Sequence, residues 1–148
     1  SGEDHLLYMP YHDYYVFISF LREAAIDPKV TKIGITIYRV PSASKVMIAL
    51  INAARNGKEV NAVLELRARF DEANNVKWSK RLKEAGVKVI FGVQGLKVHS
   101  KIGYIERKAE GDTATSYAFI STGNFHSGTA KLYTDHLLLT SNPKIFQR

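Results

Sequence analysis

Cysteine is absent from this chain of 148 residues, which excludes disulfide frameworks, cysteine-ligated zinc and thiol catalysis. Long apolar runs are absent as well, since none approaches the roughly 20 residues that a membrane span needs. The first residues, Ser1 to Asp4, include no initiator methionine and no basic-then-apolar signal pattern. We therefore expect one domain over residues 1–148, cut from a longer protein.

Acidic residues are also scarce, with 14 Asp and Glu against 21 Lys and Arg, a net charge of +7. This excess favours an anionic partner, whether nucleic acid, a phosphorylated substrate or an acidic membrane surface, although a basic surface without a ligand would look the same. One basic cluster has no aromatic side chains interleaved to stack bases, so it predicts a solvated helix face and no nucleic-acid groove. Its members are Lys77, Lys80, Arg81, Lys83 and Lys88.

Apolar spacing and chain breakers predict a regular alternation of elements after an irregular opening segment. Helices are expected over 14–25, from a cap at Ser42 or Ser44 to Gly57, and from a cap at Asp71 to Gly86; strands are expected over 32–40, 59–66, 87–91, 97–107, 115–121 and 132–140. The first part of this order, β-α-β-α-β, is typical of a parallel sheet, and the later strands suggest antiparallel pairing. The predicted fold class is therefore α/β with a mixed sheet.

Arginines follow the first two predicted parallel strands at their carboxyl ends, where ligands of such sheets collect. Arg39 comes after the first strand, and Arg67 and Arg69 come after the second. Two guanidinium groups that converge on one crevice would match the oxygens of a phosphate. The alternative is that each arginine lies on an ordinary surface loop.

A histidine and a lysine stand two residues apart at His99 and Lys101, at the start of a predicted strand. Residues two apart on a strand point to the same face, so these side chains are expected to project together. The ammonium would bind phosphate oxygens and favour the neutral, nucleophilic imidazole. Such a pair also arises readily by chance in a lysine-rich chain.

A small hydroxyl-rich turn, Ser121 to Asn124, follows the next predicted strand and offers backbone N–H groups and an amide to an anion or a histidine. A simple turn is the alternative. The remaining histidines have no metal-binding spacing with a supporting carboxylate, so zinc is not expected and each is interpreted as structural. They are His5, His12, His126 and His136.

Taken together, these segments resemble the first C-terminal catalytic domain of the bacterial polyphosphate kinases over nearly the whole chain. The resemblance rests on five motifs in order, at 36–39, 65–72, 95–101, 122–125 and 129–135. It implies a fold of the phospholipase D type, whose H-x-K motif has the same histidine and lysine. It also implies reversible transfer of the terminal phosphate of ATP to polyphosphate through a phosphohistidine.

The resemblance assigns roles residue by residue. The nucleophile falls on His99, the arginines of the magnesium and phosphate site fall on Arg39 and Arg69, and a tyrosine of the triphosphate tunnel falls on Tyr133. Lys101 and Asn124 would serve the same phosphate oxygens or orient the imidazole. An arginine has no lone pair for a cation, so Arg39 and Arg69 would reach Mg²⁺ only through phosphate oxygens that the metal also holds.

Several positions depart from the family's usual pattern, and the family's other domains are needed for catalysis. We therefore expect this chain alone to have little or no kinase activity. The implied partners are ATP, ADP, polyphosphate and the remaining domains, in a homo-oligomer, with no nucleic acid and no transmembrane segment. The implied location is the cytoplasm, with peripheral association at the inner membrane as an alternative. The departures are Tyr8-Met9, Gly34-Ile35, Ser121 and His126.

Two other functions compete with this interpretation. The first is a phospholipase D-like phosphodiesterase half-site, whose usual aspartate position is held here by Glu106 and whose asparagine would precede Asn124. The second is a basic α/β module that binds anions or partner domains without catalysis.

Overall fold

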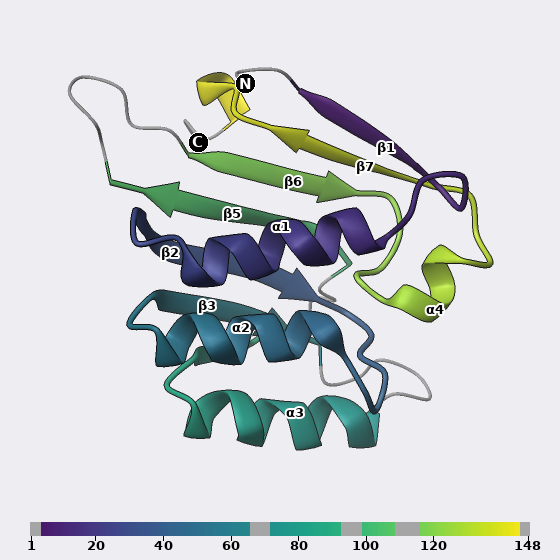
Figure 1. Ribbon diagram of the computed structural model, residues 1–148. Helices are drawn as coiled ribbons and strands as arrows, with labels where there is room; N and C mark the ends of the chain where they lie inside the picture. The colour runs from purple at the N-terminus through teal and green to yellow at the C-terminus, as the bar shows by residue number, and fades with distance from the viewer. Residues whose placement is uncertain (1–3, 66–71, 93–98, 109–115, 146–148) are drawn as a thin grey trace.

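A computed structural model describes residues 4–65, 72–92, 99–108 and 116–145 of the chain. Within these ranges helices and strands alternate as Figure 1 shows. The elements are β1 (His5–Met9), α1 (Tyr15–Ile26), β2 (Val30–Ile37), α2 (Lys45–Arg55), β3 (Glu59–Leu64), α3 (Glu72–Glu84), β4 (Lys88–Phe91), β5 (Ile102–Arg107), β6 (Tyr117–Ser121), α4 (Ser127–Ala130), β7 (Asp135–Thr140) and the 3₁₀ helix η1 (Pro143–Ile145).

The described strands form one sheet in the order β1-β7-β6-β5-β2-β3-β4. Strands β2, β3 and β4 are parallel to one another. The pairs β2–β5, β5–β6, β6–β7 and β7–β1 are antiparallel. The predicted mixed sheet, parallel first and antiparallel later, is therefore confirmed. Alternation of direction places the carboxyl ends of β2, β3 and β6 at the same edge as the first residues of β5 and β7.

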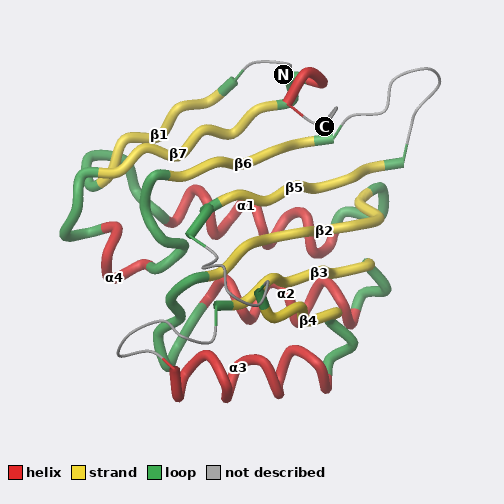
Figure 2. Tube along the Cα trace, turned by 180° about the vertical axis from the view of Figure 1, so that it is seen from behind, coloured by secondary structure: helices red, strands yellow, loops and turns green. Residues whose placement is uncertain are grey.

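Helices α1, α2 and α3 lie together on one face of this sheet, and the view from behind in Figure 2 shows the other face of the sheet in front of them. The core lies between the helices and the sheet, where Phe17, Leu50 and Leu82 are fully buried. Ser44 caps α2, because its hydroxyl accepts a hydrogen bond of 3.3 Å from the Met47 amide. No helix among the described residues is both long enough and apolar enough to span a bilayer.

Glycines end two of the predicted helices as expected. Gly57 and Gly86 have φ angles of 80° and 91°, in the left-handed region that a helix C-terminus favours for glycine. The predicted cap at Asp71 lies outside the described residues.

The structure corrects three predicted element boundaries. The opening segment is not irregular, because β1 pairs with β7 from His5 to Met9. The strand predicted from residue 97 begins only at Ile102, and the one predicted from residue 132 begins at Asp135. In each case pairing with a neighbouring strand, and not the local apolar pattern, decides where the strand starts.

Candidate functional site

The candidate site lies at the edge of the sheet where β2 ends and β5 begins. Antiparallel pairing of these strands reaches its last rung at Ile35 opposite Gly103. Residues beyond this rung, Tyr38 and Arg39 on one side and His99 to Lys101 on the other, follow the end of β2 and precede the start of β5. Segments about 60 residues apart in sequence therefore meet at one edge.

His99 and Lys101 come together, as predicted, although neither lies in a strand. The Lys101 Nζ atom is 3.2 Å from His99 Nδ1 and 3.2 Å from His99 Nε2, so the ammonium lies equally close to the two ring nitrogens. Lys101 is buried with 7% of its surface exposed, whereas His99 is exposed. The arrangement leaves the imidazole open to a substrate and holds a fixed cation beside it.

Burial lowers the pKa of Lys101 below the usual value for lysine, because desolvation disfavours the charged form. The negative charge of Asp135 acts in the opposite direction and raises that pKa. No carboxylate among the described residues lies within salt-bridge distance of Lys101. The ammonium is thus a buried cation that no described carboxylate pairs with directly.

The aromatic ring of Tyr38 contacts both members of this pair. Its centroid lies 5.6 Å from that of the His99 ring, at an interplanar angle of 68°. The same ring lies 5.8 Å from Lys101 Nζ and 5.9 Å from Arg39 Cζ, within the range of cation–π attraction. The buried side chain of Asn75 donates a 3.0 Å hydrogen bond to the Tyr38 carbonyl, which ties this segment to α3. Tyr38 therefore lies at the centre of the cationic groups.

The turn after β6 is tied to the first residue of β7. The Thr122 hydroxyl donates to Asp135 Oδ1 at 3.1 Å and accepts from the His136 amide at 3.0 Å. A β-carbon at Gly123 would overlap the Asp135 carboxylate, so any larger residue there would require that carboxylate to shift. In Asn124, half-buried, the Oδ1 atom is buried without a hydrogen-bond partner among the described residues. The turn predicted to orient an anion thus holds a carboxylate firmly and leaves one amide oxygen unused.

The described side chains suit phosphate better than a directly bound metal ion. No group of three or more His, Cys, Asp and Glu that would hold a metal occurs in the part of the chain that the structure describes. The charged groups that converge are the cations Arg39 and Lys101, with the His99 imidazole beside them. Magnesium prefers carboxylate, carbonyl and water oxygens. These residues therefore do not fit a protein-ligated magnesium ion.

Two predicted site residues remain to be placed. Arg69 lies outside the described residues. Tyr133 precedes β7 at the same sheet edge and is 62% exposed. The strand-end rule points to Tyr38 together with Arg39, but no role was predicted for Tyr38 or for Asp135, although both stand inside motifs that carried the resemblance.

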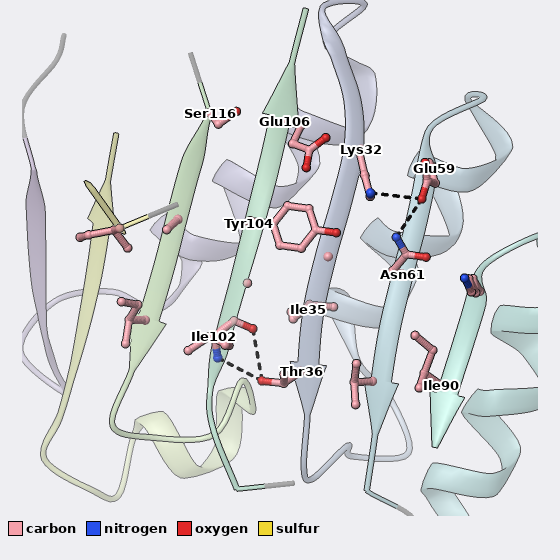
Figure 3. A pocket seen from close by; sticks show the side chains of 17 residues that line it. Lys32, Ile35, Thr36, Glu59, Asn61, Ile90, Ile102, Tyr104, Glu106 and Ser116 are labelled. Carbon is pink, nitrogen blue, oxygen red and sulfur yellow. Dashed lines mark hydrogen bonds and ion pairs between the residues drawn. The ribbon is translucent and has the colours of Figure 1, made fainter. Parts of the chain in front are cut away.

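A separate shallow pocket of about 760 Å³ lies on the sheet face opposite the helices. Figure 3 shows its polar end, where Lys32 forms a 3.4 Å ion pair with Glu59, and its other end, where Thr36 meets Ile102. His99 and Lys101 are not among its lining residues. This pocket borders the candidate site at Thr36 without being part of it.

Comparison with known proteins assigns the chain to a family. A family described as "Polyphosphate kinase C-terminal domain 1" matches residues 1–148. A polyphosphate kinase of Vibrio parahaemolyticus is 54% identical over 145 residues, 98% of this chain and 21% of that protein. The chain belongs to the polyphosphate kinase family. It spans about a fifth of the length of the curated polyphosphate kinases that it matches.

Solved structures agree with the fold. The crystal structure of polyphosphate kinase from Porphyromonas gingivalis matches with a TM-score of 0.83 and 41% identity, over 97% of this chain and 24% of that one. NucT from Helicobacter pylori matches with a TM-score of 0.70 at 13% identity, over 97% of this chain and 87% of NucT, and shows the fold alone. The predicted α/β fold with a mixed sheet is confirmed.

Proposed function

We propose that this chain contributes one wall of the active site of an ATP:polyphosphate phosphotransferase, with His99 as the nucleophile. The observation that carries the proposal is the contact of the exposed His99 imidazole with the buried ammonium of Lys101, 3.2 Å away. Family membership supplies the reaction, because the curated relatives are named polyphosphate kinase. The cluster of cations supplies the reason why a phosphate chain would bind at this edge.

In the forward reaction a lone pair of the His99 imidazole attacks the γ-phosphorus of ATP. The N–P bond forms as the bond from that phosphorus to the β,γ-bridging oxygen breaks, and ADP leaves with the bridging oxygen. In the second half, a terminal oxygen of polyphosphate attacks the same phosphorus and the N–P bond breaks, which regenerates His99. Both halves are reversible, because the phosphoramidate and the phosphoanhydride are each formed and broken by the same in-line displacement.

The cations would act on charge and position. Lys101 would bind an oxygen of the transferring phosphoryl group while its ammonium contacts the His99 ring. Arg39 would bind two oxygens of the neighbouring phosphate with its planar guanidinium group. Arg69 and Tyr133 are assigned to the phosphate site by family resemblance. Magnesium enters this proposal only as an ion carried by the substrate phosphates, which it partly neutralises when bound. No step is assigned to it.

The phosphodiesterase alternative is disfavoured by the place of Glu106. This residue holds the position of the usual aspartate. In the strand register it lies opposite Lys32, near the end of β5 that is far from His99. Figure 3 shows Glu106 and Ile102 at opposite ends of that strand. A carboxylate so placed does not assist chemistry at His99.

Labelling tests the proposal in the full-length protein that carries this chain. Incubation with γ-labelled ATP and Mg²⁺ should give protein-bound label that is stable in base and lost in acid, and His99→Ala should abolish it. The matched control is His126→Ala, since the His126 Nδ1 atom already accepts a hydrogen bond of 3.0 Å from the Gly128 amide in its own turn. Undiminished labelling in His99→Ala would refute the assignment.

The length of the chain leads to a second proposal. Because the chain spans about a fifth of the length of the curated polyphosphate kinases, we expect the isolated chain to transfer little or no phosphate from ATP to polyphosphate. The measurement is polyphosphate synthesis by the isolated chain and by the full-length protein at equal molar concentration. Comparable rates would contradict the expectation.

A further inference from the structure

The Thr36 side chain contacts the segment before β5 just beyond the last paired residues of β2 and β5. The last paired residues are Ile35 and Gly103, and Thr36 follows on β2. Its hydroxyl donates a hydrogen bond of 2.6 Å to the Ser100 carbonyl and accepts one of 3.0 Å from the Ile102 amide. The Ile102 carbonyl lies 3.2 Å from the same oxygen. Figure 3 shows Thr36 directed at the first residue of β5.

These contacts hold the backbone on both sides of Lys101. The Ser100 carbonyl belongs to the peptide group that precedes Lys101, and the Ile102 amide belongs to the peptide group that follows it. One hydroxyl oxygen therefore contacts both peptide planes of Lys101. The second plane is also held from the other side, because the Ser121 amide donates a 2.8 Å hydrogen bond to the Lys101 carbonyl, whereas among the described contacts only Thr36 reaches the first. The Lys101 side chain leaves this segment to meet His99 at 3.2 Å.

We propose that Thr36 is a positioning residue for phosphoryl transfer, which sets the placement of Lys101 and, through it, of His99. The inference rests on the proposed function for its catalytic consequence and on the hydrogen bonds alone for its structural part. Continued strand pairing would keep the segment in line with β2, whereas the Thr36 hydroxyl holds it where Lys101 also contacts the Tyr38 ring, 5.8 Å from Nζ. Misplacement of a catalytic group by about 1 Å costs up to about 100-fold in rate.

The test compares Thr36→Val with Thr36→Ser in the full-length protein. Valine keeps the branched shape and removes the hydroxyl, so kcat for polyphosphate synthesis should fall about 10- to 100-fold with KM for ATP changed less than about threefold. Serine keeps the hydroxyl and should restore kcat to within about threefold of the parent. The matched control is Thr31→Val, which removes a 3.3 Å hydrogen bond from Thr31 to the Glu106 carbonyl at the far end of the same strand pair and should leave kcat unchanged.

A second measurement does not depend on catalysis. Hydrogen exchange of the Ile102 amide should be slow in the parent and in Thr36→Ser, and faster by at least about tenfold in Thr36→Val. His99→Ala should leave this exchange unchanged while it abolishes labelling. Persistent labelling in His99→Ala would therefore refute His99 as the nucleophile without bearing on the hydrogen bonds of Thr36. Parental kcat and parental exchange in Thr36→Val, or failure of Thr36→Ser to restore kcat, would overturn the positioning role.

Discussion

The ring of Tyr38 offers a quantitative test of how the site is held together. Its centroid lies 5.8 Å from Lys101 Nζ and 5.9 Å from Arg39 Cζ. A cation–π interaction contributes about 0.5–1 kcal/mol at an exposed site and about 2 kcal/mol where water is excluded. Because Lys101 is buried and Arg39 is half-buried, we take about 1 kcal/mol for each cation.

Tyr38→Leu removes both cation–π interactions. A combined loss of about 2 kcal/mol in the transition state corresponds to a slowing of about 30-fold. Tyr38→Phe keeps the ring face and should stay within about threefold of the parent. The assay is rapid-quench formation of labelled phosphohistidine from γ-labelled ATP in the full-length protein, at saturating ATP.

The same substitution changes an electrostatic property of Lys101. The π face favours the ammonium, so Tyr38→Leu should lower the pKa of Lys101 further below the usual lysine value, in the direction that burial already sets. The alkaline limb of the rate profile should move to lower pH. A Leu variant as fast as the parent, or a Phe variant as slow as the Leu variant, would refute the argument.

Two further predictions follow from neighbouring contacts. Asp135→Asn removes the negative charge that raises the pKa of Lys101, so this pKa should fall. In a pH–rate profile, the alkaline loss of phosphoryl transfer should then begin at lower pH. An unchanged profile would contradict the role of Asp135. Gly103→Ala would drive a β-carbon into the fully buried ring of Phe119, which cannot swing into solvent. It should destabilise the fold by about 3 kcal/mol in denaturant unfolding, and a loss below about 1 kcal/mol would show that the core yields there.

Local chemistry was sufficient to predict the three long helices α1, α2 and α3, although the short helix α4 was not predicted. The cap at Ser44 and the stop at Gly57 depend on side chains and backbone angles within a few residues, so the sequence carries the information directly. Strand β1 was missed for the opposite reason. Its five residues have no clear alternation, and they become a strand because Leu7 lies opposite Leu137 of β7, about 130 residues away.

The sequence predicted that His99 and Lys101 meet, but for a reason that the structure corrects. The prediction placed both on a strand, where residues two apart share a face, whereas β5 begins after them at Ile102. In the structure this segment contacts the Thr36 hydroxyl at the end of β2, the Tyr38 ring beyond it and the Ser121 amide at the end of β6. None of these contacts is visible in the sequence, since they depend on β5 lying between β2 and β6.

The place of a lysine in this fold also decides how strongly its charge can act on a bound phosphate. Lysines along α3, such as Lys77 and Lys80, are exposed and fully hydrated, so they contribute to net charge without a local cost. Lys101 is buried, its pKa is lowered by desolvation, and Asp135 offsets only part of that cost. A buried ammonium without a directly paired carboxylate gains more from an incoming phosphate than a hydrated one does. Under the proposed function, burial therefore makes Lys101, and not the exposed lysines of α3, the cation that should bind the transferring phosphoryl group.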